Sequence, residues 1–210
     1  MIEIKHLTKC FGKRVVFNDI NLNLTSGKVY ALTGSSGCGK TTLLNIIAKL
    51  ESYDKGKILY KEKDINTIKS TLFFRNELGY LFQNFGLLDN EDVSTNLDLG
   101  LINRKCNYKE KDKLKKDVLE RVGLTHIHLE QKIYELSGGE AQRVALAKII
   151  LKNPPLILAD ELTASLDPTT SQGIMKLLLD MKNENRLIII ATHNPDIWNQ
   201  ADEVINLNQL

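Results

Sequence analysis

Apolar and polar residues alternate along two segments near the start of the chain. Residues 2–7 and residues 15–24 both repeat with a period of two. That period is typical of strands that bury one face and expose the other. Because the two segments follow each other closely, they predict an antiparallel pair of strands.

The pattern changes at residue 29, where a short and continuous apolar stretch begins. Residues 29–33 predict a buried strand, and a glycine-rich loop follows it directly. From Lys40 to Leu50 the apolar residues recur with the spacing of a helix. The order of strand, glycine-rich loop and helix is the context in which such a loop binds phosphate.

The middle of the chain is predicted to be largely helical. A short strand at 79–82 precedes a region, about 89–153, in which strand patterns disappear. Residues 104–116 are rich in lysine with interspersed acids, which indicates a solvated helix and loop rather than an interaction patch. Ser137 is the predicted N-cap of a helix over about 139–151, and Pro154 ends that helix.

Strands and helices alternate again in the last part of the chain. Apolar strands are predicted at 156–159, 187–191 and 204–207, with a helix across 174–181. Continuous apolar strands that alternate with helices are typical of a parallel sheet covered on both faces. The predicted fold class is therefore α/β.

The composition is that of one globular domain, with room for a small inserted subdomain. The 210 residues are 42% apolar and 26% charged, which is enough for one well-buried core. The formal net charge of +2 gives no reason to expect a nucleic acid partner. We expect no signal peptide and no membrane helix, because no stretch approaches about 18 apolar residues. Any work at a membrane would then proceed through a partner.

The cysteines favour a reducing compartment. Cys10, Cys38 and Cys106 are odd in number and widely spaced, and they form no CxxC pair. A disulfide framework or a zinc site is therefore not expected, and the cytoplasm is the default location. Cys38 lies inside the glycine-rich loop, where its side chain has no required chemistry, and we interpret it as a passive occupant rather than a redox sensor.

The glycine-rich loop carries a complete phosphate-binding motif. Its glycines let the backbone curl so that N–H groups point at the β-phosphate, and the following helix adds its positive end. Lys40 is expected to neutralise phosphate charge, and the Thr41 hydroxyl is expected to ligate Mg²⁺. The predicted nucleotide-binding residues of this motif are Gly34, Ser35, Ser36, Gly37, Cys38, Gly39, Lys40, Thr41 and Thr42.

Two acids end the apolar strand at 156–159. Asp160 occupies the usual place of a carboxylate that holds Mg²⁺ through water. Glu161 points the other way along the chain and is predicted to orient and polarise the attacking water. The structural alternative is a pair of surface acids that close a strand, but the phosphate-binding motif upstream favours the catalytic role.

A third motif, Leu136-Ser137-Gly138-Gly139-Glu140, stands between the loop and the acid pair. The three motifs together resemble the ATP-binding cassette (ABC) ATPase family, over essentially the whole chain. The resemblance implies one cassette over 1–210, with a P-loop NTPase (RecA-like) core, an N-terminal antiparallel β subdomain and an inserted α-helical subdomain. Residues 1–88 and 154–210 would form the ATP-binding core, and 89–153 the helical subdomain.

The resemblance also assigns residues to ATP hydrolysis. Gln83 matches the glutamine that contacts Mg²⁺ and water and senses the membrane partner, and His193 matches the switch histidine at the γ-phosphate. Ser165-Leu166-Asp167 resembles the loop that crosses the dimer interface, so Asp167 is a predicted nucleotide-site residue. Phe11 and Val16 match the adenine site, with a role as core residues as the alternative. The histidines at 6, 126 and 128 are interpreted as surface or packing residues.

In the family geometry, the third motif serves a second molecule. Ser137, Gly138 and Gly139 would close over the γ-phosphate of ATP held by another subunit, so the ATP-bound state is expected to be a homodimer. One position departs from the family pattern, because Leu162 stands where proline usually follows the catalytic glutamate. Proline would stiffen that turn, so the hydrolysis rate, but not nucleotide binding, depends on this difference.

Residues 79–85 and 96–101 resemble small bacterial cassettes of the bacteriocin-export group, which belong with the MacB and lipoprotein-release ATPases. This implies a peripheral ATPase on the inner face of the membrane, held there by a permease that chooses the cargo. Other classes of nucleotide-binding protein fit less well. A GTPase would need a guanine-specific motif, and none is present. The chain is too short for the coiled-coil insertions of DNA-repair and chromosome-organising ABC ATPases, or for the second cassette of translation-type ABC proteins. The remaining alternative is a signalling or cell-envelope regulator that works through a similar membrane partner without transport.

Overall fold

The computed structural model describes residues 1–162 and 166–210. Its internal contacts divide the chain into two compact units. The first unit comprises Met1–Leu78, Pro155–Glu161 and Lys182–Leu210. The second comprises Gly79–Pro154 and Leu162–Met181. The boundaries predicted from sequence, at 89 and 153, stay a prediction.

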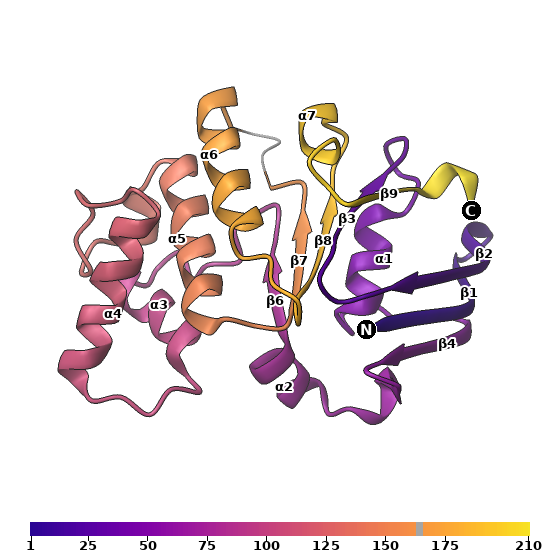
Figure 1. The fold of residues 1–210 in the computed structure, drawn as a ribbon, viewed down its shortest axis with the longest axis horizontal. Coiled ribbons are helices and arrows are strands. Elements are labelled where there is room, and N and C mark those ends of the chain that lie inside the picture. Colours follow the sequence, from indigo (N-terminus) through magenta and orange to yellow (C-terminus); the bar gives the residue numbers. More distant parts are fainter. Residues whose placement is uncertain (163–165) are drawn as a thin grey trace. The chain divides into compact units, whose positions relative to one another are not determined.

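The first unit begins with an antiparallel sheet (Figure 1). Strands β1 (Ile2–Phe11) and β2 (Arg14–Leu24) pair in a register that sets Ile2 opposite Leu24, which confirms the predicted antiparallel pair. On the other edge of β1 lie β4 (Lys55–Tyr60) and then β5 (Lys63–Asp64). The pattern along the chain did not predict β4, because its first half is a polar Lys-Gly-Lys stretch.

A parallel sheet forms the rest of the first unit. Strands β7 (Leu156–Asp160), β8 (Leu187–Ala191), β3 (Val29–Thr33) and β9 (Glu203–Asn206) are neighbours in that order. Every residue of β3, β7 and β8 is buried, which explains their continuous apolar pattern. Helix α1 (Lys40–Ile47) packs on β7 and β8, and α7 (Pro195–Trp198) packs on β3. The carboxyl ends of the strands therefore meet at one edge, beside the start of α1.

The described part of the second unit is mostly helical. Strand β6 (Leu78–Leu81) starts at the last residue of the first unit's opening segment and ends one residue earlier than predicted. The helices of the second unit are α3 (Val93–Leu101), α4 (Tyr108–Arg121), α5 (Gly138–Lys152) and α6 (Pro168–Leu179). Gly100 lets α3 approach α5, since a Cβ there would lie 2.5 Å from the carbonyl oxygen of Lys148. The shared apolar core is formed by Val93, Leu97, Leu101, Val118, Leu119, Val122, Leu124, Ile127, Leu129, Ile133, Val144, Ala147 and Leu151.

The lysine-rich segment differs from its prediction at one residue. Most of α4 is solvated as expected, but Lys115 is buried. Its ammonium lies 2.9 Å from a carboxylate oxygen of Asp98 and donates a hydrogen bond to the hydroxyl of Ser94. The lysine therefore ties α4 to α3, which a count of charges along α4 cannot predict.

Short elements complete the fold. In the first unit, α2 (Ser70–Leu72) leads into a π-helical turn over Phe73–Glu77, and the last strand passes into a 3₁₀ turn over Leu207–Gln209. Two more 3₁₀ turns lie at Ile65–Thr67 and Ile133–Glu135. Within residues 1–162 and 166–210, no helix is long and apolar enough to span a bilayer.

Candidate functional site: a phosphate-binding loop beside a pair of acids

The phosphate-binding loop connects β3 to α1. Gly39 precedes the helix with φ at 110°, in the left-handed region, and its carbonyl accepts the first helical hydrogen bond, from Leu43. The Lys40 ammonium folds back over the loop and donates to the carbonyls of Gly34 and Ser35, at 3.0 and 3.2 Å. A buried ammonium is thus held at the loop, where phosphate charge would be neutralised.

Two features favour glycine at residue 39: the positive φ of its backbone and the lack of room for a side chain. A Cβ at residue 39 would lie 2.7 Å from side-chain atoms of both Val16 and Phe17. We expect Gly39→Ala to lower the free energy of unfolding by about 2–4 kcal/mol, because backbone strain adds to a steric clash. Gly12→Ala is the matched control: Gly12 also has positive φ, but nothing lies within 4 Å of its Cβ position. It should cost about 1 kcal/mol. Urea denaturation measures both, and equal losses would contradict the packing argument.

Two side chains that the sequence did not single out also hold the loop. Arg14, on β2, donates to the carbonyl of Gly37 at 2.6 Å. Asn208, in the last turn of the chain, lies 3.1 Å from the Ser35 hydroxyl. Both contacts join residues far apart in sequence, so no local motif could have identified them.

The acid pair lies at the carboxyl end of β7. The Thr41 hydroxyl donates to a carboxylate oxygen of Asp160 at 3.1 Å, which joins the start of α1 to the end of the strand. Burial raises the pKa of Asp160 above its usual value, and the charge of Glu161 adds to this. The Thr41 hydrogen bond and the charge of Lys40 oppose the shift without cancelling it.

Glu161 turns the chain away from the strand. Its φ of 45° is unusual for a residue with a side chain, and its N–H donates to the carbonyl of Ala191 on β8. Strained backbone of this kind clusters at functional sites. The Glu161 carboxylate lies 3.5 Å from Nδ1 of His193, which follows β8 and is largely exposed. The predicted base and the predicted switch histidine are therefore neighbours.

The two residues predicted for the adenine site lie in the same unit. Val16 packs against the loop at Gly39 and is partly buried. Phe11 ends β1 with 48% of its surface exposed, and the Lys9 ammonium lies 4.4 Å from the centre of its ring. The exposed ring of Phe11 and the place of Val16 beside the loop describe the two side chains, and their assignment to the adenine site stays a prediction.

The third motif starts helix α5 in the second unit. Ser137 is its N-cap, as predicted, and the helix begins at Gly138, one residue earlier than expected. The capping box is complete: the N–H of Glu140 donates to the Ser137 hydroxyl, and the Glu140 carboxylate accepts from the Ser137 N–H. Ser137 and Gly138 are exposed, so this end of the helix is open to solvent.

The remaining predicted residues also belong to the second unit. Gln83 is exposed in a turn after β6, and that turn is tied to α5 by a hydrogen bond of 2.6 Å from the Lys148 ammonium to the Gly86 carbonyl. Asp167 caps α6 by accepting from the N–H of Thr170, and hydrogen bonds from Thr170 lower the pKa of Asp167. Ser165 lies outside the described residues.

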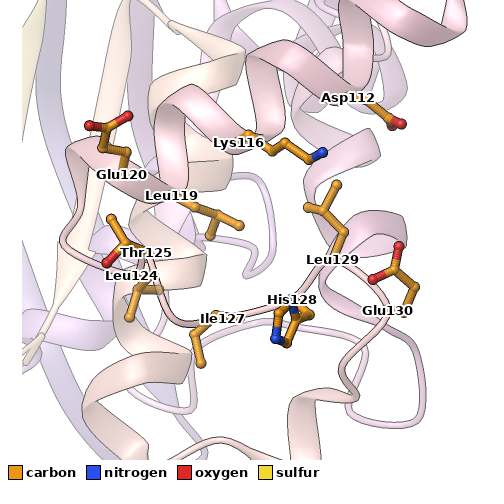
Figure 2. Close-up of a pocket in the computed structure, with 10 residues that line it drawn as sticks. All are labelled: Asp112, Lys116, Leu119, Glu120, Leu124, Thr125, Ile127, His128, Leu129 and Glu130. Carbon is orange, nitrogen blue, oxygen red and sulfur yellow. The ribbon is translucent and has the colours of Figure 1, made fainter.

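A pocket lies elsewhere in the second unit, between α4 and residues 124–130 (Figure 2). Its lining mixes polar side chains such as Lys116 and His128 with apolar ones such as Leu119. None of the predicted site residues lines it. The chemistry of the loop and the acid pair, rather than this hollow, identifies the site.

Comparison with known proteins agrees with this chemistry. The ABC transporter family model matches residues 17–164. The methionine import ATP-binding protein MetN of Clostridium acetobutylicum is 39% identical over 94% of this chain, and the chain spans only 62% of that relative's length. An uncharacterised ABC transporter ATP-binding protein of Methanocaldococcus jannaschii is 34% identical over 99% of this chain and 95% of the relative.

Solved structures have the same fold. The ATP-binding cassette MJ0796, in a dimeric post-hydrolysis state bound to ADP and Pi, superimposes with a TM-score of 0.88 at 30% identity. The alignment covers 98% of this chain and 94% of that one. The fold predicted from sequence, a P-loop core with an antiparallel β subdomain, is confirmed. The chain belongs to the ABC transporter family and is one of its ATP-binding cassette ATPases.

Proposed function

We propose that the loop and the acid pair bind ATP with Mg²⁺. The observation that carries this is the 3.1 Å hydrogen bond between Thr41 and Asp160, which sets two hard oxygen ligands side by side at the helix N-terminus. Such a pair suits Mg²⁺, which usually keeps waters and phosphate oxygens as its other ligands. Gln83 is proposed as a further ligand. The bound ion would neutralise charge that develops on the phosphates.

We assign Glu161 the role of general base in hydrolysis. Its carboxylate accepts a proton from a water, whose oxygen bonds to the γ-phosphorus while the bond from that phosphorus to the β,γ-bridging oxygen breaks. ADP and phosphate are the products. His193, 3.5 Å from Glu161, orients the carboxylate and contacts the γ-phosphate, and Lys40 stabilises the charge on the transferred group. Phe11 and Val16 hold the adenine.

The third motif completes the site of a second copy. Ser137, Gly138 and Gly139 would close on the γ-phosphate of the partner's ATP, with Asp167 at the interface between copies. Support comes from the exposed N-terminus of α5 and from the dimeric state of the similar cassette MJ0796. Two ATP molecules would then hold a homodimer together, and hydrolysis would release it.

A membrane permease is the proposed partner, with the cassette in the cytoplasm on the inner face of the membrane. The relatives work in different systems: MetN is a methionine import ATP-binding protein, and MacB of Campylobacter jejuni is a macrolide export ATP-binding/permease protein. MacB is 32% identical over 99% of this chain. We favour peptide or bacteriocin export, or MacB-like transfer of mechanical work, because of the segments at 79–85 and 96–101.

The alternative is a cell-envelope regulator that acts through a similar membrane partner without moving a substrate. The cell division ATP-binding protein FtsE of Bacillus subtilis supports it, with 36% identity over 95% of this chain and 88% of its own length.

Co-purification tests the proposed partner. The tagged chain, extracted with mild detergent in the presence of Mg-ATP, should retain a membrane protein that mass spectrometry identifies. A permease with few spans and a large extracellular domain would support the MacB-like hypothesis. A many-spanning importer would contradict it, and the absence of any membrane protein would contradict the permease itself. A variant with Lys40→Ala is the control, because it should lose the nucleotide-dependent part of the association.

A further inference from the structure

A chain of hydrogen bonds runs from a histidine to the N-cap of α5. His126 Nε2 lies 2.7 Å from one carboxylate oxygen of Glu140. The other oxygen of Glu140 accepts from the Ser137 hydroxyl at 2.7 Å and from the Ser137 N–H at 2.8 Å. Both ends of the carboxylate are therefore occupied, one by the serine of the third motif and one by the imidazole.

In this arrangement the proton of the Ser137 hydroxyl is already used in a hydrogen bond to Glu140. A serine hydroxyl has one proton to donate, and here it is donated to Glu140. In the proposed dimer that same proton would be needed for the γ-phosphate of the partner's ATP. Closure of the dimer therefore requires the hydroxyl to exchange one acceptor for the other.

Glu140 also brings negative charge to the place where phosphate would bind. The pKa of Glu140 is lowered to about 2, mainly by the hydrogen bond with His126 and to a smaller extent by those from Ser137. Its carboxylate is therefore ionised at every working pH. An ionised carboxylate only accepts hydrogen bonds, so His126 must carry its proton on Nε2. Near a triphosphate, the charge of Glu140 opposes closure unless a cation compensates it.

We propose that His126 is a positioning residue for the third motif: in its charged form it holds Glu140, offsets its charge and so favours closure on the partner's ATP. The inference rests on the proposed function. In either protonation state the imidazole donates from Nε2 to one oxygen of Glu140, but only the charged imidazole also offsets the negative charge, so that Ser137 is released more easily to the phosphate. When the imidazole is neutral, the carboxylate keeps its full charge beside the incoming nucleotide.

Within the part of the chain that the structure describes, His126 forms its ion pair with Glu140. From α5, Glu140 is the acid that faces the imidazole, and Arg143 of the same helix donates instead to the carbonyl of Val122. On the same loop, His128 lines the pocket between α4 and residues 124–130 together with Lys116 (Figure 2). His128 is thus a matched control, since it is an exposed histidine two residues away with other neighbours.

The test measures the dimer directly. In a Glu161→Gln parent, which should bind ATP without hydrolysing it, the dissociation constant of the dimer is measured in saturating Mg-ATP by analytical ultracentrifugation. Measurements at about pH 6 and about pH 8 span the range in which histidines change charge. At each pH the dissociation constant of the variant is divided by that of the parent. This ratio cancels the effects of pH on ATP and on the other histidines, which both proteins share.

We expect His126→Gln to weaken the dimer about fivefold at the lower pH and little at the higher pH, since an exposed ion pair contributes modestly and each dimer holds two. His126→Arg should keep the dimer tight at both. Glu140→Gln, which preserves the capping box, should abolish the effect of His126→Gln. His128→Gln should match the parent throughout.

Other outcomes would overturn the inference. One is a dissociation constant of the His126→Gln dimer that equals the parent's at the lower pH, and another is equal weakening at both pH values. The inference would also fail if His126→Gln still weakened the dimer in the presence of Glu140→Gln, or if His128→Gln weakened it as His126→Gln does. A parent that remains monomeric with ATP would instead overturn the proposed function on which the inference rests. The two failures are therefore distinguishable.

Discussion

Glu161→Gln is expected to reduce ATP hydrolysis at least about 100-fold and to trap a stable ATP-bound dimer. Glutamine keeps the shape and the hydrogen-bonding capacity of the side chain but has no basic oxygen to accept the proton of water. The substitution also removes a negative charge next to Asp160, where that charge raises the pKa of the neighbouring acid. The variant should therefore repel the γ-phosphate less than the parent does. We expect it to retain ATP binding although it loses hydrolysis.

Size-exclusion chromatography with light scattering checks this prediction in excess Mg-ATP. The variant should elute as a dimer with ATP and as a monomer with ADP. Glu184→Gln is the control, because it makes the same change at an exposed acid of the first unit and should leave hydrolysis unchanged. A Glu161→Gln chain that stays monomeric with ATP would refute the composite site, and one that still hydrolyses ATP would remove Glu161 from the role of base.

The parts of the fold that were predicted correctly depend on local rules. The strand over residues 29–33, the loop and helix α1 follow from an apolar run, a glycine spacing and a helical period within about twenty residues of one another. The buried strands β7 and β8 follow in the same way. Strand β4 was missed because its partner is β1, about fifty residues away, and its own sequence begins with polar residues.

In the candidate site, too, the residues that belong to local motifs could be predicted, and those that act through distant contacts could not. Lys40, Thr41 and Asp160 were identified from motifs, and the hydrogen bond between Thr41 and Asp160 joins two of those motifs in space. Arg14 and Asn208 contact the loop through side chains that belong to no motif. Their roles follow only from the tertiary fold.

His126 illustrates a further limit. The sequence indicates a surface or packing residue, and the side chain of His126 is 61% exposed. What the sequence could not reveal is that the loop after α4 returns to the N-terminus of α5, which brings His126 to Glu140. The proposed role of His126 therefore depends on a contact that only the tertiary fold creates.

Ser137→Arg is expected to abolish ATP hydrolysis while ATP affinity changes by no more than about twofold. Ser137 is exposed, so the larger side chain fits without repacking, and the lost N-cap costs about 1 kcal/mol. The arginine would occupy the space over the helix N-terminus and prevent its N–H groups from reaching phosphate, a loss of preorganised donors worth about 100-fold or more. Asn103→Arg, at another exposed position of the second unit, adds the same charge and should leave hydrolysis intact.

Mixing the two inactive variants decides whether the third motif acts on its own chain or on a second copy. In a dimer of one Ser137→Arg chain and one Glu161→Gln chain, the first supplies an intact Glu161 and the second an intact Ser137. If the motif serves the partner, these two groups meet in one of the two sites, and the mixture hydrolyses ATP although neither variant does alone. If the motif serves its own chain, every site lacks one group and the mixture stays inactive. Loss of ATP binding by Ser137→Arg alone would likewise place the motif at its own chain's nucleotide, so recovered hydrolysis on mixing is the result that a composite site demands.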